Sequence, residues 1–323
     1  MNKNELHGKK ALTLFTHFRT FQRFFVKDSM TFSVIVPTYN RINLLKNTLA
    51  SLYKQDFSDF EIIVVNDGST DSTHEYLSSA AEEGKVAYLH HPNQGLAATR
   101  SAGLKIARGK FIAFTDDDCV LPPNWLSQYH AKFESENAVC VGGNCITGNP
   151  ENPCAEANDV MQSYFKEKGN DLGIPFFTGN NVAYAHSVLL EVGGPDKKFR
   201  MGAEDRDLLE RVSSTGGKIV YAPNITVTHF NDSDFSRFVR HQFEFGEGSY
   251  LYYSVQRSRS KKRSAFPLSA YLGVFLAPFK NRTGARAIRL ILLIVVAQMA
   301  VTAGYIRQYM VHMLGSTTVF AAA

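Results

Sequence analysis

Short apolar runs alternate with amphipathic segments through the first third of the chain. The apolar runs predict buried strands, and they cover residues 32–36, 61–65, 86–89 and 111–114. The segments between them carry apolar residues at helical spacing, and they cover residues 44–52, 72–83 and 96–107. Strands that alternate with helices favour an α/β domain with a mostly parallel sheet.

The pattern is less regular from residue 115 to residue 235. Glycines recur there around Gly142, Gly179, Gly193 and Gly216, which is typical of loops. We therefore expect a second, loop-rich half that packs onto the first half of the same domain.

The C-terminal part holds a run of 17 uncharged residues, Leu290–Ile306. As a helix this run spans about 26 Å, slightly less than a hydrocarbon core, and residues 287–289 extend it to nearly the usual length. We predict a transmembrane helix here, with a buried core helix as the alternative. Residues 266–279 contain two prolines between Arg263 and Lys280, which predicts a re-entrant or interfacial segment.

Residues 1–30 form a basic extension with apolar residues at helical spacing, which predicts either an interfacial helix or a loosely ordered segment. Charged and polar residues interrupt the segment 12–26, so we expect no cleavable signal peptide. The other expected divisions are the α/β domain at 31–235, a basic helical linker at 236–265, a membrane-associated region at 266–310 and a tail at 311–323.

The formal charge of +5 is unevenly distributed. Residues 31–256 carry 19 Lys and Arg against 28 Asp and Glu, so the basic excess lies towards the ends. Nine basic residues and no acidic residue lie between Arg257 and Arg289, next to the long apolar run. This arrangement suits an anionic membrane surface and argues against nucleic acid as a partner.

The four cysteines favour a reducing compartment. They form no C-x-x-C pair and have no histidine at zinc spacing, and they are Cys119, Cys140, Cys145 and Cys154. We expect reduced thiols in the core, and a membrane-associated protein whose main domain faces the cytoplasm.

Three consecutive carboxylates follow the predicted strand 111–114, at Asp116, Asp117 and Asp118. Like charges this close repel one another unless a cation lies between them or some are protonated. Mg²⁺ or Mn²⁺, with oxygen ligands from Asp118 and from a diphosphate, would remove this repulsion. A solvated acidic turn is the alternative.

Polar clusters also follow the first two predicted strands. The first strand ends in Pro37-Thr38-Tyr39-Asn40, and the second ends at Asp67-Gly68. The carboxyl ends of parallel strands meet at one edge of a sheet, where ligands bind. Asp67 could accept hydrogen bonds from a base or ribose there, although the same residues also suit a plain strand-to-helix turn.

The ordered series of these motifs resembles glycosyltransferase family 2, whose members have the GT-A fold. The segments that carry the resemblance are 33–40, 65–69, Asn93-Gln94-Gly95 with Arg100, and 116–118, and the likeness extends over about residues 31–235. The expected fold is therefore α/β with a mostly parallel central sheet, plus C-terminal membrane-associated helices.

The resemblance implies a nucleotide-sugar donor, with UDP-sugars favoured. It places Asp67 at the base, Asp116 near the ribose and Asp118 on a divalent metal, with Asp117 as the variable middle position. The other positions that it places around the donor nucleotide are Pro37, Thr38, Asn40, Gly95 and Arg100.

Downstream, the residues 178–181 and 202–208 resemble the acceptor-side loop and the Glu-Asp signature of the family. Asp205, beside Glu204, is the candidate general base that would deprotonate an acceptor hydroxyl. His229 matches a position near the metal and diphosphate and is a second candidate metal ligand. Arg237, Arg240 and the adjacent 241–242 either contact phosphate or form a basic helix face.

Together these features predict an inverting transfer of a sugar to a saccharide or lipid-linked acceptor hydroxyl, in cell-envelope polysaccharide or glycolipid synthesis. Three alternatives remain open. A sugar nucleotidylyltransferase would need a glycine-rich basic loop after the first strand, which residues 37–41 do not provide. An inactive membrane-bound scaffold that binds nucleotide sugars would bind without turnover, and a glycoside hydrolase would leave the Asp67 turn unexplained.

Overall fold

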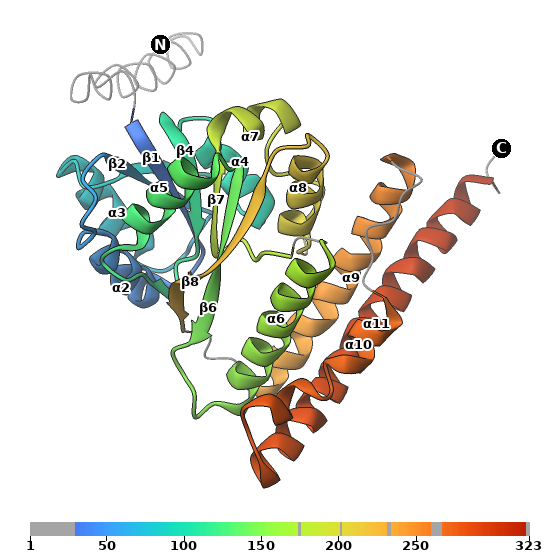
Figure 1. Ribbon diagram of the computed structural model, residues 1–323. Coiled ribbons are helices and arrows are strands. Elements are labelled where there is room, and N and C mark those ends of the chain that lie inside the picture. The colour runs from blue at the N-terminus through green and yellow to red at the C-terminus, as the bar shows by residue number, and fades with distance from the viewer. Residues whose placement is uncertain (1–29, 174–175, 201, 231–233, 260–266, 321–323) are drawn as a thin grey trace.

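The computed structural model describes residues 30–173, 176–200, 202–230, 234–259 and 267–320 (Figure 1). An eight-stranded sheet in the order β3-β2-β1-β4-β7-β6-β8-β5 forms its centre. The strands are β1 (Met30–Thr38), β2 (Phe60–Asn66), β3 (Ala87–His90), β4 (Gly109–Thr115), β5 (Cys119–Val120), β6 (Cys140–Thr147), β7 (Asn181–Ala185) and β8 (Ile219–His229).

Most strands of the sheet run in one direction. β1 pairs in parallel with both β2 and β4, β2 pairs in parallel with β3, and β6 pairs in parallel with β8. β7 is antiparallel to both β4 and β6, and β5 is antiparallel to β8. The predicted α/β class with a mostly parallel sheet is confirmed.

Helices cover both faces of the sheet, and central strands such as β1 and β4 bury side chains on both sides. Apolar residues of α2 (Ile42–Leu52), α3 (Thr73–Glu82) and α5 (Trp125–Glu136) pack in one core. Those of α4 (Leu96–Leu104), α7 (His186–Val192) and α8 (Glu204–Ser213) pack in the other. The four strands and three helices predicted before residue 115 are confirmed, with small differences at their ends.

The expectation of an irregular, loop-rich half after residue 115 was wrong in one respect. The described residues of this stretch contain four strands and four helices, including the 20-residue α6 (Pro153–Leu172). The Asn152 side chain caps α6 by accepting hydrogen bonds from the amides of Cys154 and Ala155, and Pro153 occupies its first turn. The glycines suggested loops, but several of them lie inside strands or at helix ends.

Asn181 joins β7 to the elements around it. Its amide nitrogen donates to the carbonyl oxygens of Asn144 and Ile225, and its Oδ1 accepts from Trp125 Nε1 and Tyr129 Oη. The side chain is buried, and Asn181 pairs across the sheet with Thr115, directly before the three aspartates. One amide therefore fixes strands β6, β7 and β8 and helix α5 relative to the end of β4.

A second layer of helices lies beside the sheet (Figure 1). It contains α6, α9 (Phe235–Arg259), α10 (Leu268–Gly273), the short 3-10 helix η2 (Ala277–Lys280) and α11 (Gly284–Phe320). Buried residues of α6, α9 and α11 form a separate apolar cluster that includes Met161, Phe238, Leu290 and Ile294. The stretch expected to be a linker at 236–265 therefore contains a long packed helix.

Helices α9 and α11 approach each other closely at two glycines. A Cβ atom on Gly246 would lie 2.0 Å from the carbonyl oxygen of Val301, and one on Gly304 would lie 2.0 Å from that of Phe243. Each glycine therefore lets one helix backbone contact the other.

The predicted N-terminal helix or extension lies outside the described residues.

We predict that Asn181→Leu lowers the free energy of unfolding by at least about 3 kcal/mol, because it leaves several buried donors and acceptors without partners. Chemical denaturation measures this. The control is Asn224→Leu at an exposed position, which should change stability by only about 0.5 kcal/mol. Equal losses in the two variants would contradict the role given to Asn181.

Candidate active site

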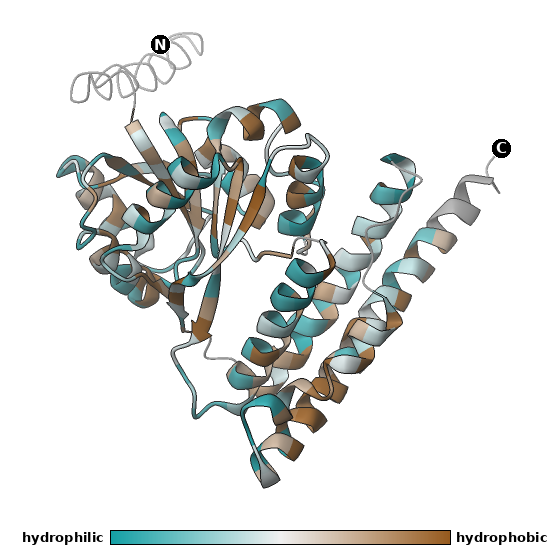
Figure 2. Ribbon diagram, in the orientation of Figure 1, coloured by the Kyte–Doolittle hydropathy of each residue, from teal (hydrophilic) through white to brown (hydrophobic). Residues whose placement is uncertain are grey.

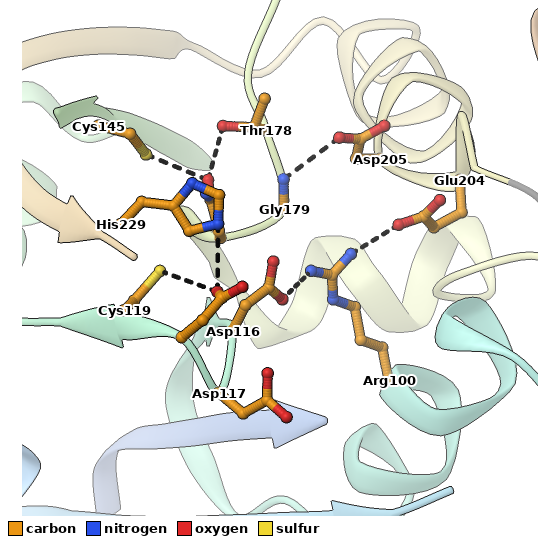
Figure 3. Close-up of polar contacts among 12 residues, drawn as sticks. Arg100, Asp116, Asp117, Cys119, Cys145, Thr178, Gly179, Glu204, Asp205 and His229 are labelled. Carbon is orange, nitrogen blue, oxygen red and sulfur yellow. Dashed lines mark hydrogen bonds and ion pairs between the residues drawn. The ribbon is translucent and has the colours of Figure 1, made fainter. Parts of the chain in front are cut away.

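The candidate residues gather at the carboxyl edge of the parallel strands, as their positions after β1, β2 and β4 required. The acidic loop after β4, the N-terminus of α8 and the end of β8 all reach this edge. Figure 3 shows Arg100 between Asp116 and Glu204, with Asp205 bound to the Gly179 amide. Residues that are far apart in the sequence thus form one continuous polar site.

Arg100 is the central cation of this site. Its guanidinium is buried, with NH2 2.7 Å from Asp116 Oδ1 and NH1 2.7 Å from Glu204 Oε1. A Cβ atom on Gly179 would lie 2.3 Å from the same guanidinium, so glycine is required where the loop before β7 passes over Arg100. The predicted Thr178-Gly179 loop is thereby held against the acidic loop.

Three carboxyl groups interact electrostatically with this guanidinium: those of Asp116, Glu204 and Asp205. Burial, followed by repulsion from Asp205, raises the pKa of Glu204 to about 7 despite the attraction of Arg100. Burial also raises the pKa of Asp205, although Arg100 and the amides of Arg206 and Gly179 oppose the shift. Asp205 Oδ1 accepts from the Arg206 amide at 2.7 Å, and its Oδ2 accepts from the Gly179 amide at 3.2 Å.

Asp118 has two basic neighbours. His229 Nε2 lies 3.2 Å from Asp118 Oδ1, and Arg41 NH1 lies 2.8 Å from Asp118 Oδ2. Burial would raise the pKa of Asp118, but His229 and Arg41 outweigh it and lower this pKa. The pairing with Asp118 also raises the pKa of His229 against the effect of burial.

Asp117 faces the end of β1. Its Oδ2 accepts from the Thr38 hydroxyl at 2.7 Å, and its Oδ1 lies 3.3 Å from Arg41 NH1. Burial raises the pKa of Asp117 to about 7, with Arg41 opposing the shift and Asp118 adding to it. Sequence reasoning missed Arg41 as a partner of these aspartates; the available signal was a basic residue immediately after the strand-end motif.

Asp67 and Asn40 shape the loops that follow β1 and β2. The Asp67 carboxylate is buried and accepts from the amides of Gln94 and Gly95 at 2.8 and 2.9 Å. Asn40 has a positive φ of 54°, and its side-chain oxygen accepts from the Thr70 amide at 2.7 Å. The structure therefore brings Asp67 to Gly95 and Asn40 to the turn after β2.

Two further predicted features have clear positions. Gln242 on α9 is buried, and its amide donates to Asn158 Oδ1 at 2.7 Å, so it packs against α6. All four cysteines are buried free thiols, as expected. In the described part of the chain, three or more His, Cys, Asp or Glu side chains nowhere gather as a ready-made metal site.

The acidic loop nevertheless suits a hard divalent ion. Asp118 and Asp116 supply carboxylate oxygens, and His229 adds a nitrogen beside Asp118. Mg²⁺ and Mn²⁺ are commonly held by one or two carboxylates together with substrate phosphates, so an incomplete protein ligand set is what such a site requires.

A comparison with known protein families shows the family to which this chain is related. The family described as Glycosyl transferase family 2 matches residues 33–193, which include the acidic loop, Arg100 and Gly179. The chain belongs to glycosyltransferase family 2. The predicted resemblance is therefore confirmed, and the GT-A fold expected from it agrees with the solved structures below.

This chain matches its curated relatives over only part of their length. Validoxylamine A glucosyltransferase of Streptomyces hygroscopicus subsp. jinggangensis is 28% identical over 217 residues, which is 57% of this chain and 51% of that protein. Chondroitin synthase of Escherichia coli is 28% identical over 221 residues, 57% of this chain and 32% of that protein. The chain spans about half or less of these relatives.

Solved structures show the same fold at low identity. The mannosyltransferase PcManGT of Pyrobaculum calidifontis, in complex with GDP-Man and Mn²⁺, has a TM-score of 0.56 and 19% identity, and the match covers 98% of this chain and 90% of that one. TarS 1–349 of S. aureus in complex with UDP has a TM-score of 0.53 and 19% identity, covering 88% and 92%.

We predict that stability falls as the pH rises from about 4.5 to about 7. Glu204 has a higher pKa in the folded chain than its ordinary value of 4.5, so the folded chain binds more protons in this window. Glu204→Gln should flatten this decline, as measured by denaturation at a series of pH values. The exposed Glu134→Gln is the control and should keep the wild-type slope; equal slopes in all three proteins would rule out the assignment.

Proposed function

We propose that this chain is an inverting, metal-dependent glycosyltransferase that moves a sugar from a nucleotide-sugar donor to an acceptor hydroxyl. The observation that carries the proposal is the convergence at one sheet edge of the acidic loop after β4, which holds Asp118, and the start of α8, which holds Asp205. Arg100 joins these two segments by binding the neighbouring residues Asp116 and Glu204. A carboxylate for a metal and a second carboxylate for a proton are the two groups that a single displacement requires.

The acidic loop would hold the metal and the donor diphosphate. Asp118 and His229 are the proposed ligands, with Asp116 and the variable Asp117 beside the donor. When bound, Mg²⁺ or Mn²⁺ supplies charge neutralisation for the departing nucleoside diphosphate. That the mannosyltransferase neighbour is a complex with Mn²⁺ supports this choice of cofactor.

Asp205 is the proposed general base. Its side chain is only partly buried, whereas that of Glu204 is buried and bound to Arg100. The raised pKa of Asp205 makes its carboxylate a better proton acceptor when the acceptor hydroxyl attacks the anomeric carbon. Glu204 would act by positioning Arg100, and through it Asp116, and attack opposite the leaving group would invert the anomeric configuration.

The nucleotide would lie over the ends of β1 and β2. We assign Pro37, Thr38, Asn40, Asp67 and Gly95 to this side, with Asp67 acting on the base directly or through the 94–95 loop that it binds. UDP-sugars are the favoured donors, and the TarS neighbour is known in complex with UDP.

The proposed acceptor is a saccharide or lipid-linked hydroxyl in cell-envelope polysaccharide or glycolipid synthesis. One described helix, residues Gly284–Leu314 of α11, is long and apolar enough to cross a membrane. We propose that residues 31–235 form the catalytic domain at the cytoplasmic face, and that residues 266–310 associate with the membrane.

The proposal is tested with the full chain, Mn²⁺ and a panel of nucleotide sugars, reading out transfer or donor hydrolysis. Asp205→Asn should lower transfer by about 10²- to 10⁴-fold while leaving the donor Kd unchanged. Glu210→Gln on the same helix is the control and should transfer at the wild-type rate.

Full transfer by Asp205→Asn would contradict the base assignment. Release of pyrophosphate from a nucleoside triphosphate would instead indicate a nucleotidylyltransferase. Nucleotide binding without any turnover across the panel would indicate an inactive scaffold.

A further inference from the structure

Arg41 crosses from the loop after β1 to the acidic loop after β4. Its NH1 lies 2.8 Å from Asp118 Oδ2 and 3.3 Å from Asp117 Oδ1. Both carboxylates are nearly buried, with side chains 8% and 5% exposed, whereas the Arg41 side chain is 49% exposed. A cation that can swing into solvent is thus bound to two carboxylates that cannot.

Other contacts hold the two carboxylates in place without Arg41. The Thr38 hydroxyl donates to Asp117, and His229 lies against the other oxygen of Asp118. A divalent ion on Asp118 would lie close to the guanidinium bound to Oδ2 of the same carboxylate, and two cations on one carboxylate repel each other strongly in a poorly solvated site. Departure of Arg41 would therefore free a ready-made oxygen ligand.

We propose that Arg41 is a resident counterion that competes with the divalent metal for Asp118. On displacement it turns to the diphosphate, where a guanidinium donates well to phosphate oxygens. The inference rests on the metal-dependent function proposed above, but it concerns binding rather than turnover.

The experiment measures Mn²⁺ binding by titration calorimetry on the full chain without nucleotide. Arg41→Ala should bind Mn²⁺ at least about tenfold more tightly than the wild type, a gain of about 1.4 kcal/mol. In the presence of Mn²⁺ the same variant should bind UDP more weakly. Arg41→Lys, which keeps a cation, should stay near the wild-type Mn²⁺ affinity.

Arg108→Ala is the matched control, because Arg108 is also a largely exposed arginine, 41%, on a buried carboxylate, Glu61. It should leave Mn²⁺ binding unchanged, and Asp118→Asn should abolish it. Unchanged or weaker Mn²⁺ binding by Arg41→Ala would overturn the proposal while leaving the transferase assignment intact. Absence of Mn²⁺ binding in every variant, both without nucleotide and with UDP present, would overturn both this proposal and the metal dependence.

A second inference comes from the outer surface of the helical layer. One face of α11 packs against α6 and α9, and large apolar residues on the opposite face are exposed. Figure 2 shows that hydrophobic positions are frequent along α10 and the first half of α11. The exposed apolar residues that we assign to this surface are Leu268, Leu272, Leu276, Phe279, Ile288, Leu292, Val295, Met299, Ile306, Met310, Met313 and Leu314. We call this set the apolar outer face.

The packing of α11 opposes an upright crossing of a bilayer. Helix α9 lies along α11 at the Gly246 and Gly304 contacts and carries Arg237, Arg240 and Glu244, so a spanning α11 would bring these charges towards hydrocarbon. The predicted transmembrane helix therefore does not fit its neighbours. A helix that lies in the plane of the membrane would cover the apolar outer face and leave α9 in water.

The surrounding charge indicates which surface covers this face. Lys280 and Arg289 are exposed beside it, within the segment 257–289 that has nine basic and no acidic residues. We infer that α10 and α11 lie flat in the interface of an anionic bilayer. This orientation also keeps α6, α9 and the catalytic sheet on one side of the membrane.

The inference is tested by flotation of the full chain with phosphatidylcholine vesicles, with and without phosphatidylglycerol. Leu292→Glu and Met299→Glu should each weaken binding to the anionic vesicles at least about tenfold, because they place a charge on the apolar outer face that the membrane would cover. Leu190→Glu is the control, since Leu190 is equally exposed, 66%, but lies on α7. It should bind as the wild type does.

Labelling of Thr283→Cys and Arg307→Cys on sealed vesicles separates the two orientations, because the native cysteines are buried and Arg307, which pairs with Glu247 of α9, lies on the side that stays in water. In the flat orientation an impermeant maleimide added outside labels both positions. Labelling of only one position would show a crossing helix and overturn the inference. Dimerisation without vesicle binding would show that a second copy covers the face, which would also overturn it.

Discussion

The buried guanidinium of Arg100 is the interaction on which the site depends. It comes from α4 in the first half of the domain, and it binds Asp116 after β4 and Glu204 at the start of α8. An unpaired charge at this depth would cost several kilocalories per mole, so the three groups hold one another in place. The residue before Glu204, Ala203, has a left-handed φ of 67°, a local cost that turns the first residues of α8 towards Arg100.

Much of the first half of the fold could be predicted from the sequence because its strands are buried on both faces. Continuous apolar runs such as β1 and β4 differ plainly from the helices between them. The position of the acidic loop followed from the same logic, since strand ends collect at one edge. Strand order and the antiparallel insertion of β7 could not be predicted, because they depend on contacts such as those of Asn181 with four distant residues.

The candidate site was predictable as a set of residues and less so as a set of contacts. The motif series gave the aspartates, Glu204, Asp205 and His229, but it could not show that Glu204 binds Arg100 while Asp205 stays partly exposed. Arg41 meets Asp117 and Asp118 across more than 70 residues of sequence. Local spacing shows a basic residue directly after the strand-end motif, but it cannot show which distant carboxylates that residue binds.

The two glycine contacts between α9 and α11 make this helix pair rigid. Where backbones touch at Gly246 and Gly304, the helices can neither slide past nor rotate against each other without collision. Helices α9 and α11 therefore move as one rigid pair, so any displacement of α11 must carry α9 with it.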